Sequence, residues 1–233
     1  MDIRFDPERL WLGRSHETSW LRQIRLCSEE ILFIMEKKRH RIRFGEADMA
    51  ELLHLLHQEH TNIGKLLTIC ERVVGSLATP DVQALDMVCE VLEYMQAYPD
   101  VWHHPLEDAI LKKLENRDVT TSKQIGDLEK HHEALAELTS ESLAITKSIL
   151  ADETVSRDVF RQSVMLFVEK YRDHIRLEEE LFFPAARRTL TEADWEEIKN
   201  DFADPGDPLF GSKASEHFMR LRFEIFQNDG AYG

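Results

Sequence analysis

Apolar residues recur every three or four positions along most of the chain, which is the period of an amphipathic helix. Helices with this period are expected at 48–75, from about 81 to beyond 110, at 121–151 and at 155–187. The clearest stretch, 155–187, has an apolar face formed by Phe160, Val164, Phe167, Tyr171, His174, Glu178, Leu181 and Ala185. No segment shows the alternation of a strand. The pattern therefore predicts an all-α protein, a four-helix bundle with extra N- and C-terminal helices.

Capping and breaking residues indicate where these helices begin and end. Asp48, followed three residues later by Glu51, has the spacing of a capping box at the start of the first bundle helix. Pro99 and Pro105 fall inside the second helix, where each removes a backbone donor and is expected to kink or break it near His103.

The remaining periodic stretches lie outside the four long helices. A helix is expected at 17–40, and Thr191 is expected to cap a short helix that precedes a final helix at 214–227. We therefore expect a helical extension over 1–45, the bundle over 46–189 and a second helical extension over 190–233.

Charge and composition narrow the class of protein. The net charge of −15 disfavours binding to nucleic acid, whose phosphates are also negative. The longest apolar runs are about five residues, far short of the roughly 20 that span a bilayer, and no apolar leader follows the charged start. Cys27, Cys70 and Cys89 are odd in number and scattered. We expect a cytoplasmic protein that binds neither nucleic acid nor a membrane.

Histidine is the residue type that stands out against this background. The eleven histidines include three groups, His54/His57/His60, His103/His104 and His131/His132, and the single His174. Each of the four expected bundle helices thus has a histidine on or beside its apolar face. Two helices also have His-x-x-x-Glu, as His103–Glu107 and His174–Glu178, and residues four apart share one face of a helix.

The spacing of these groups repeats along the chain. His60 and His103 are 43 residues apart, and His132 and His174 are 42 apart. Four histidines, with His131 or His132 on the third helix, and two glutamates are then expected to converge in the core. A histidine–glutamate pair on one helix can also be an ordinary intrahelical contact, but such contacts do not account for histidines on all four faces.

Two buried carboxylates without partners are costly, and bound cations offset that cost. A mixed imidazole and carboxylate set suits iron or manganese better than copper, and the absence of thiolates disfavours structural zinc. The residues therefore favour a pair of iron or manganese ions, and zinc is the less favoured choice.

Four segments, "QEHTNIGKLL", "HHPLEDAIL", "EKHHEALAEL" and "DHIRLEEELFFPAA", resemble in this order the hemerythrin-like proteins with the HHE cation-binding domain. The resemblance covers about 48–188, and the tail "LTEADWEEIKNDF" is similar to an extension of some bacterial members. It implies an up-and-down four-helix bundle around a non-haem di-iron centre, so the expected cofactor is two iron ions, with or without an oxo bridge, and manganese or zinc is the less favoured choice. Carried over by position, the implied metal ligands are His60, His103, Glu107, His132, His174 and Glu178. The two glutamates would bridge the metals.

The chain departs from the oxygen-carrying hemerythrins at two positions. Leu128 stands where those proteins have a further histidine on the third helix, and both Glu178 and Glu179 are available near their last carboxylate. One fewer histidine leaves a more open position on the third-helix side. His57, His104 and Glu179 stay open as additional or replacement ligands, or as hydrogen-bond partners of the ligands.

The resemblance implies a protein that binds or senses a small diatomic or peroxide, namely O₂, NO or H₂O₂. One alternative is a di-iron redox enzyme or an iron-delivering repair protein. Another is a structural or interaction bundle in which the metal is a staple. A homodimer formed through the N-terminal helix is a further expectation.

Overall fold

The computed structural model describes residues 48–76, 82–151, 155–202 and 204–229. Helix is the regular structure of these residues, and none of them lies in a strand, so the predicted all-α class is confirmed for this part of the chain. The predicted helix at 17–40, the extension over 1–45 and the side chain of Asp48 in the expected capping box lie outside the described residues.

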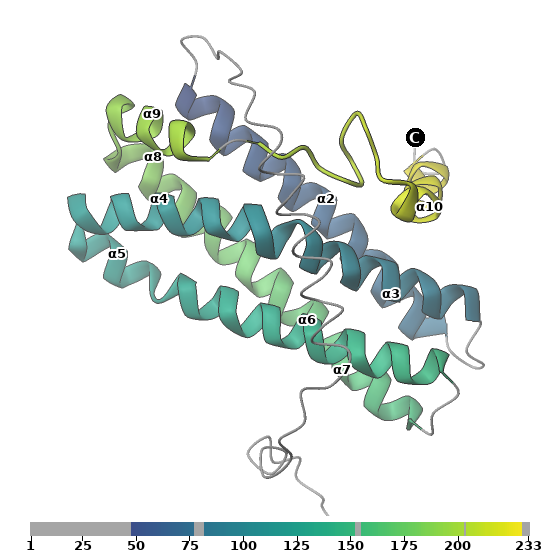
Figure 1. Cartoon of the computed structure of the whole chain (residues 1–233). Coiled ribbons are helices and arrows are strands. Elements are labelled where there is room, and N and C mark those ends of the chain that lie inside the picture. The colour runs from purple at the N-terminus through teal and green to yellow at the C-terminus, as the bar shows by residue number, and fades with distance from the viewer. Residues whose placement is uncertain (1–47, 77–81, 152–154, 203, 230–233) are drawn as a thin grey trace, which may run out of the picture. The chain divides into compact units, whose positions relative to one another are not determined.

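The helices follow the expected order along the chain (Figure 1). They are α2 (Asp48–Ser76), α3 (Val82–Ala97), a π-helical turn (Pro99–His103), α4 (His104–Arg117), α5 (Val119–Ile125), α6 (Leu128–Leu150), α7 (Arg157–Leu177), a second π-helical turn (Glu178–Phe182), α8 (Phe183–Thr189), α9 (Glu192–Asp201), a 3₁₀ turn (Glu216–Phe218) and α10 (Met219–Asp229).

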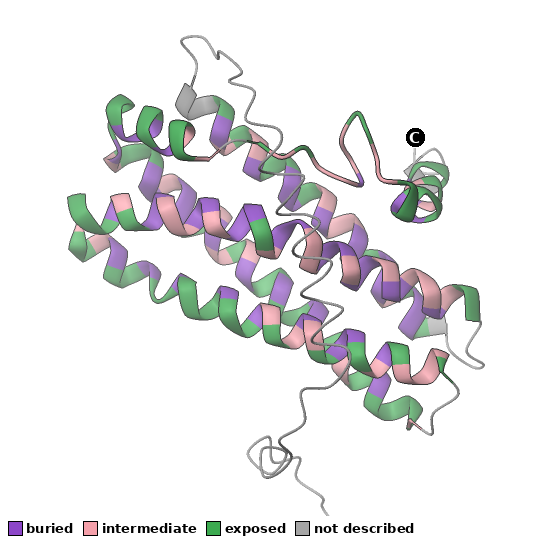
Figure 2. Cartoon of the chain, viewed as in Figure 1, coloured by how far each residue is buried: buried purple, intermediate pink, exposed green. Residues whose placement is uncertain are grey.

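Each long helix packs against two others. Helix α2 contacts α3 and α7, and α6 contacts the same two helices, so the four surround a common core. Helix α4 continues the line of α3 beyond the first π-helical turn (Figure 1). Buried residues line the sides on which these helices face one another (Figure 2). The apolar faces read from the sequence therefore meet in one core, with Leu56, Leu92, Leu135 and Phe167 among its members.

The first π-helical turn lies at the two prolines, where a kink or break was predicted. The backbone N–H of His104 donates to the carbonyl of Pro99, five residues earlier. Pro105 falls in the first turn of α4, where a missing donor costs little. The predicted interruption is confirmed, and it brings both His103 and His104 into the core.

The second π-helical turn corrects the apolar face predicted for 155–187. Leu181 was expected to face the core, but it is 48% exposed, whereas Phe182 is fully buried. The N–H of Phe183 donates to the carbonyl of Glu178, so this turn takes up one more residue than an α-helical turn. The extra residue rotates the following side chains and moves Phe182 to the position expected for Leu181.

The helix predicted over 121–151 is in fact two helices. Gly126 separates α5 from α6 with a φ of 94°, a left-handed conformation that glycine adopts without strain. Asp127 then caps α6 by accepting a hydrogen bond from the backbone N–H of Lys130. The prediction of one continuous helix was wrong here because the turn residues act locally.

Polar residues replace the expected apolar contacts at the far end of α6. Ile145 and Ile149 were expected to face inward but are only half-buried, whereas Thr139 and Thr146 are fully buried. The hydroxyl of Thr139 donates to the carbonyl of Leu135 at 2.7 Å, so its burial leaves the hydroxyl satisfied.

The C-terminal elements pack onto the long helices. Asp194 accepts hydrogen bonds from the backbone N–H of Thr191 at 2.8 Å and from its hydroxyl at 2.6 Å, which confirms Thr191 at the start of α9. Arg117 at the end of α4 binds the same carboxylate, with its Nε 2.6 Å from Oδ2. Helix α10 contacts α3. The boundaries predicted at 46 and 190 stay predictions. In the described part of the chain, every helix is too short or too polar to cross a bilayer.

Candidate metal centre

The six residues implied as ligands converge in the core from separate helices. Each is at least 94% buried, and the two glutamates are fully buried. They come from α2 (His60), the first π-helical turn (His103), α4 (Glu107), α6 (His132), the end of α7 (His174) and the start of the second π-helical turn (Glu178). Both π-helical turns therefore contribute a residue to the cluster.

One half of the cluster is built around His60 and His103. The Nε2 atom of His60 lies 3.4 Å from Oε1 of Glu107 and 3.3 Å from Oε2 of Glu178. The Nε2 atom of His103 lies 3.4 Å from the same Oε1 of Glu107. Two imidazoles and one oxygen of each glutamate thus surround one point.

The other half repeats this arrangement with His132 and His174. The Nε2 atom of His132 lies 3.6 Å from Oε2 of Glu107 and 3.4 Å from Oε1 of Glu178. The Nε2 atom of His174 lies 3.1 Å from the same Oε1 of Glu178. Each glutamate therefore offers one oxygen to each half, as a carboxylate that bridges two cations does.

These distances suit ligands of a common cation. Two donor atoms at about 2.1 Å from one ion and at right angles are about 3 Å apart. Among the described side chains, buried atoms without a hydrogen-bond partner gather here, and they include Nε2 of His60, both oxygens of Glu107, both ring nitrogens of His174 and Oε2 of Glu178. Because such atoms are costly to bury unsatisfied, the donor set fits bound cations.

Acidic residues fix the orientation of three of the imidazoles by binding Nδ1, the ring nitrogen that faces away from the central glutamates. The Nδ1 atoms of His60, His103 and His132 each lie 2.7 Å from a carboxylate oxygen, contributed by Glu179, Glu59 and Asp108 respectively. An acceptor on Nδ1 leaves the Nε2 lone pair available to a metal and orients the ring. Glu179 and Asp108 directly follow the two central glutamates in sequence.

Glu59 is the residue that sequence reasoning missed. It is 95% buried beside His60, and it also accepts a hydrogen bond of 2.6 Å from the hydroxyl of Tyr98. Burial raises the pKa of Glu59 to about 7, although the bond from Tyr98 opposes this shift. Its one signal in the sequence is an acid three residues after Leu56, next to the apolar face of the helix.

Without a metal, the central residues strongly shift one another's pKa values. Burial disfavours the charged form of His60, but its three carboxylate neighbours outweigh burial and raise the pKa of His60 to about 12. In the same way, Asp108 and Glu178 raise the pKa of His132 to about 10 against the effect of burial. Burial and the charge of Glu178 raise the pKa of Glu107 to about 8. These shifts favour protonated side chains where cations would bind, so metal binding is expected to release protons.

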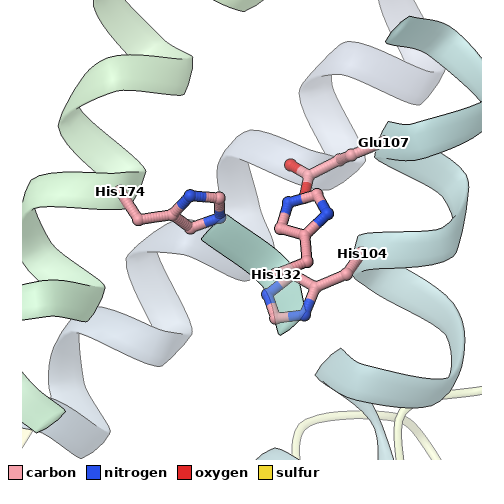
Figure 3. A group of neighbouring side chains, drawn as sticks. All are labelled: His104, Glu107, His132 and His174. Atoms are coloured by element: carbon pink, nitrogen blue, oxygen red, sulfur yellow. The ribbon is translucent and has the colours of Figure 1, made fainter. Parts of the chain in front are cut away.

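His104, one of the residues that the sequence left open as a ligand, lies among the central side chains. It stacks on His132 with ring centroids 4.4 Å apart, and its Nε2 is 3.1 Å from the hydroxyl of Tyr171. His104, Glu107, His132 and His174 each have a donor atom within 4.8 Å of the others, and Figure 3 shows them pointing toward one another. The structure thus brings a fifth histidine to the half that lacks a histidine at position 128.

The other residues that the sequence left open as ligands lie farther from the centre. His57 has a side chain that is 62% exposed and lies 3.0 Å from Glu179 rather than among the central donors. His131 is exposed, whereas His132 is buried. The geometry therefore leaves His132 as the residue of this pair that faces the centre.

Comparison with known proteins agrees with this geometry. Residues 51–186 match the model of the hemerythrin HHE cation binding domain. The chain is 22% identical over 178 residues to uncharacterised proteins of Mycobacterium bovis and of two strains of Mycobacterium tuberculosis, an alignment that covers 76% of this chain and 69% of each relative. The family match spans more than half of the chain and contains all six convergent residues. The protein belongs to the hemerythrin HHE cation-binding domain family.

Proposed function

We propose that this protein binds two iron ions in an up-and-down four-helix bundle and uses them to bind or sense a small diatomic or peroxide. The observation that supports the proposal most is the pair of fully buried glutamates, each with one oxygen toward each pair of histidines. A hydrogen bond between two side chains, or one ion that only stabilises the fold, does not require two buried carboxylates that each face both pairs of histidines. When bound, the iron pair would supply reversible redox chemistry and a coordination position for the ligand.

The protein's own residues would have distinct tasks at such a centre. His60 and His103 would hold one ion, and His132 and His174 the other. Glu107 and Glu178 would bridge the two and balance their charge. The surrounding apolar core keeps bulk water away, which strengthens these electrostatic interactions.

The acidic acceptors behind the imidazoles would position the ligands. Glu59, Asp108 and Glu179 would each accept a hydrogen bond from the Nδ1–H of one histidine and hold that ring in a single orientation. His174 has no such acceptor among the described residues, because its Nδ1 is unpaired. The two histidine pairs are therefore held with unequal rigidity.

One hydrogen-bonded chain favours redox turnover as a second candidate function. The hydroxyl of Tyr98 donates to Oε1 of Glu59, whose Oε2 binds Nδ1 of His103. Because both neighbours donate to Glu59, this carboxylate can take up a proton from the imidazole of His103 when the charge of the centre changes. A redox enzyme would consume peroxide continuously in the presence of an electron donor, whereas a binding protein would stop at one ligand per centre.

Metal analysis of anaerobically purified protein is the direct test. About two irons per chain, with new absorption bands when oxygen, NO or peroxide is added, is the expected result. Iron that stabilises the fold without any spectral response to these ligands would point to a structural staple instead. Protein that takes up no iron under anaerobic loading would contradict the proposal.

A further inference from the structure

Three aromatic side chains that can each give up an electron stack in series inside the bundle. They are Tyr94 near the end of α3, Tyr98 just after it and Trp102 in the first π-helical turn. The ring centroids of Tyr94 and Tyr98 lie 5.9 Å apart, and those of Tyr98 and Trp102 lie 5.7 Å apart, with interplanar angles of 28° and 22°. Each residue is at least 96% buried. The rings therefore form one continuous row within the core, which we call the aromatic stack.

The inner end of the aromatic stack lies beside the proposed iron centre. Trp102 directly precedes His103 in the chain. The hydroxyl of Tyr98 donates to Glu59 at 2.6 Å, and the other oxygen of Glu59 lies 2.7 Å from Nδ1 of His103. The stack is therefore joined to a proposed metal ligand both along the chain and through a shared carboxylate.

The outer end of the aromatic stack lies close to the surface. The hydroxyl of Tyr94 donates to Oδ2 of Asp207 at 3.0 Å, in the segment between α9 and the 3₁₀ turn. Phe210 and Phe218 pack edge-on against the Tyr94 ring, with centroids 6.0 and 5.8 Å away. Asp207 and Phe210 are only half-buried. At these two residues, one layer of side chains separates Tyr94 from solvent.

The partners of the two tyrosine hydroxyls are not those that packing alone requires. Phenylalanine would stack in the same way without placing a carboxylate at the edge of the core. A tyrosine that loses an electron becomes a strong acid and releases its hydroxyl proton, so a base in hydrogen-bond contact makes the oxidation easier. Asp207 is such a base for Tyr94, and Glu59 has the same geometry toward Tyr98. Both tyrosines are therefore arranged for oxidation coupled to proton transfer.

We propose that the aromatic stack carries electrons, one at a time, from a small reductant at the surface to peroxide at the iron centre. This inference rests on the proposed function, with peroxide as the ligand and with the redox turnover described above. Peroxide takes up two electrons and two protons, its O–O bond breaks, and two water molecules form. Two molecules of a donor such as ascorbate each supply one electron and one proton, and each leaves as a radical.

Tyr94 is the residue that receives each electron from the donor. After Tyr94 has passed an electron inward through Tyr98 and Trp102, it is a neutral radical, and its hydroxyl proton lies on Asp207. The donor then returns an electron, and the proton moves back from Asp207 to the hydroxyl oxygen of Tyr94. The protein is unchanged at the end of each transfer, so the electrons that reduce peroxide all come from the donor.

Electron paramagnetic resonance tests the aromatic stack directly. The iron-loaded full chain is oxidised in air, so that the iron itself is not the reductant, and is then mixed with H₂O₂ and frozen. We expect a radical signal that narrows when the tyrosine rings are deuterated, and the double variant Tyr94→Phe/Tyr98→Phe should lose it. Iron content and the absorption spectrum before peroxide should stay at wild-type values. Trp195→Phe is the control and should keep the signal, because this buried tryptophan lies in α9, outside the stack.

Replacing the base separates an electron path from packing. Asp207→Asn keeps an oxygen for the backbone N–H groups of Leu209 and Phe210 but cannot take the proton of Tyr94. We expect this variant to load iron like wild type and to slow the peroxide-dependent oxidation of ascorbate several-fold. Asp204→Asn, at an exposed position of the same segment, changes the net charge equally and should keep the wild-type rate.

The outcomes separate this inference from the proposed function. Iron-loaded wild type that responds to peroxide in its absorption spectrum but forms no tyrosine radical overturns the electron path while the iron centre stands. A radical that survives in the double variant and disappears in Tyr171→Phe overturns it too, because Tyr171 is buried outside the stack. A wild-type rate of ascorbate oxidation in Asp207→Asn overturns Tyr94 as the point of entry. A wild-type chain that takes up no iron contradicts the proposed function, and this inference falls with it.

Discussion

His60 and His132 lie on opposite sides of the same two carboxylates. The Nε2 atom of each is 3.3–3.6 Å from one oxygen of Glu107 and one oxygen of Glu178. The two histidines come from α2 and α6, which are separated by α3, α4 and α5 in the chain. Both halves of the centre therefore depend on the same two glutamates.

Replacing Glu107 should therefore affect both halves at once. In Glu107→Gln we expect the iron content to fall from about two to one or fewer per chain, because a neutral amide bridges cations poorly. The metal-free variant should unfold at about the same temperature as metal-free wild type, because burial raises the pKa of Glu107 to about 8 and the amide then replaces a neutral carboxyl of the same shape. Metal analysis and thermal unfolding with and without iron measure both effects. A variant that binds two irons as tightly as wild type would exclude the bridging role.

The acidic acceptors should control affinity rather than folding. Glu59→Gln and Asp108→Asn each weaken the hold on one imidazole, and we expect iron affinity to drop about 10- to 100-fold. Competition with a chelator gives the affinity, and circular dichroism checks the fold. Glu133→Gln, at an exposed position of α6, is the control and should keep wild-type affinity. Equal affinities in all three variants would contradict the assigned roles.

The second π-helical turn makes opposite predictions for two neighbours. Phe182→Ala should destabilise the protein by about 3–5 kcal/mol, because it leaves a cavity in the core. Leu181→Ala should change the free energy of unfolding by no more than about 0.5 kcal/mol, because its side chain is 48% exposed. Urea denaturation of the metal-free proteins measures both. The reverse order would mean that the helix continues without the extra residue.

The stability that Asp194 contributes at the start of α9 should be lost at acid pH. Hydrogen bonds and charge from Arg117 lower the pKa of Asp194 from 3.8 to about 2. A carboxyl with a lowered pKa stabilises the fold fully above its unfolded value and loses that contribution as the pH falls toward the folded value. Wild type should thus be more stable than Asp194→Asn by a constant amount above pH 5, and the difference should shrink below about pH 4. Thermal unfolding of both proteins at several pH values checks this, and a difference that grows in acid would contradict it.

Periodicity was enough to predict which faces of the helices meet. His60, His103, His174 and the two central glutamates all occupy apolar-face positions, and burial of that face brings them together. The choice between His131 and His132 could not be made in this way. Neighbouring residues on a helix differ by about 100° in direction, so an apolar face of ordinary width accommodates either one.

Two of the features that sequence reasoning missed depend on local backbone events. An extra residue at Glu178–Phe182 moved Leu181 out of the core, and Gly126 divided one expected helix in two. Both change the direction of later side chains without altering the pattern of apolar residues. Glu59 was missed for a different reason, because an acid beside an apolar face normally points to solvent. Its burial is explained only by His103 and Tyr98, which come from another part of the chain.

The crossing of contacts between the two halves has a mechanical consequence. His60, His103 and Glu107 belong to the first half of the bundle, and His132, His174 and Glu178 belong to the second. In the proposed centre, each ion takes two histidines and one glutamate from one half, and it completes its shell only with the glutamate of the other. The iron pair would then link the two helical hairpins. The metal-free protein would rely on its apolar core alone to hold the hairpins together, so separately produced halves would associate more tightly in the presence of the cation.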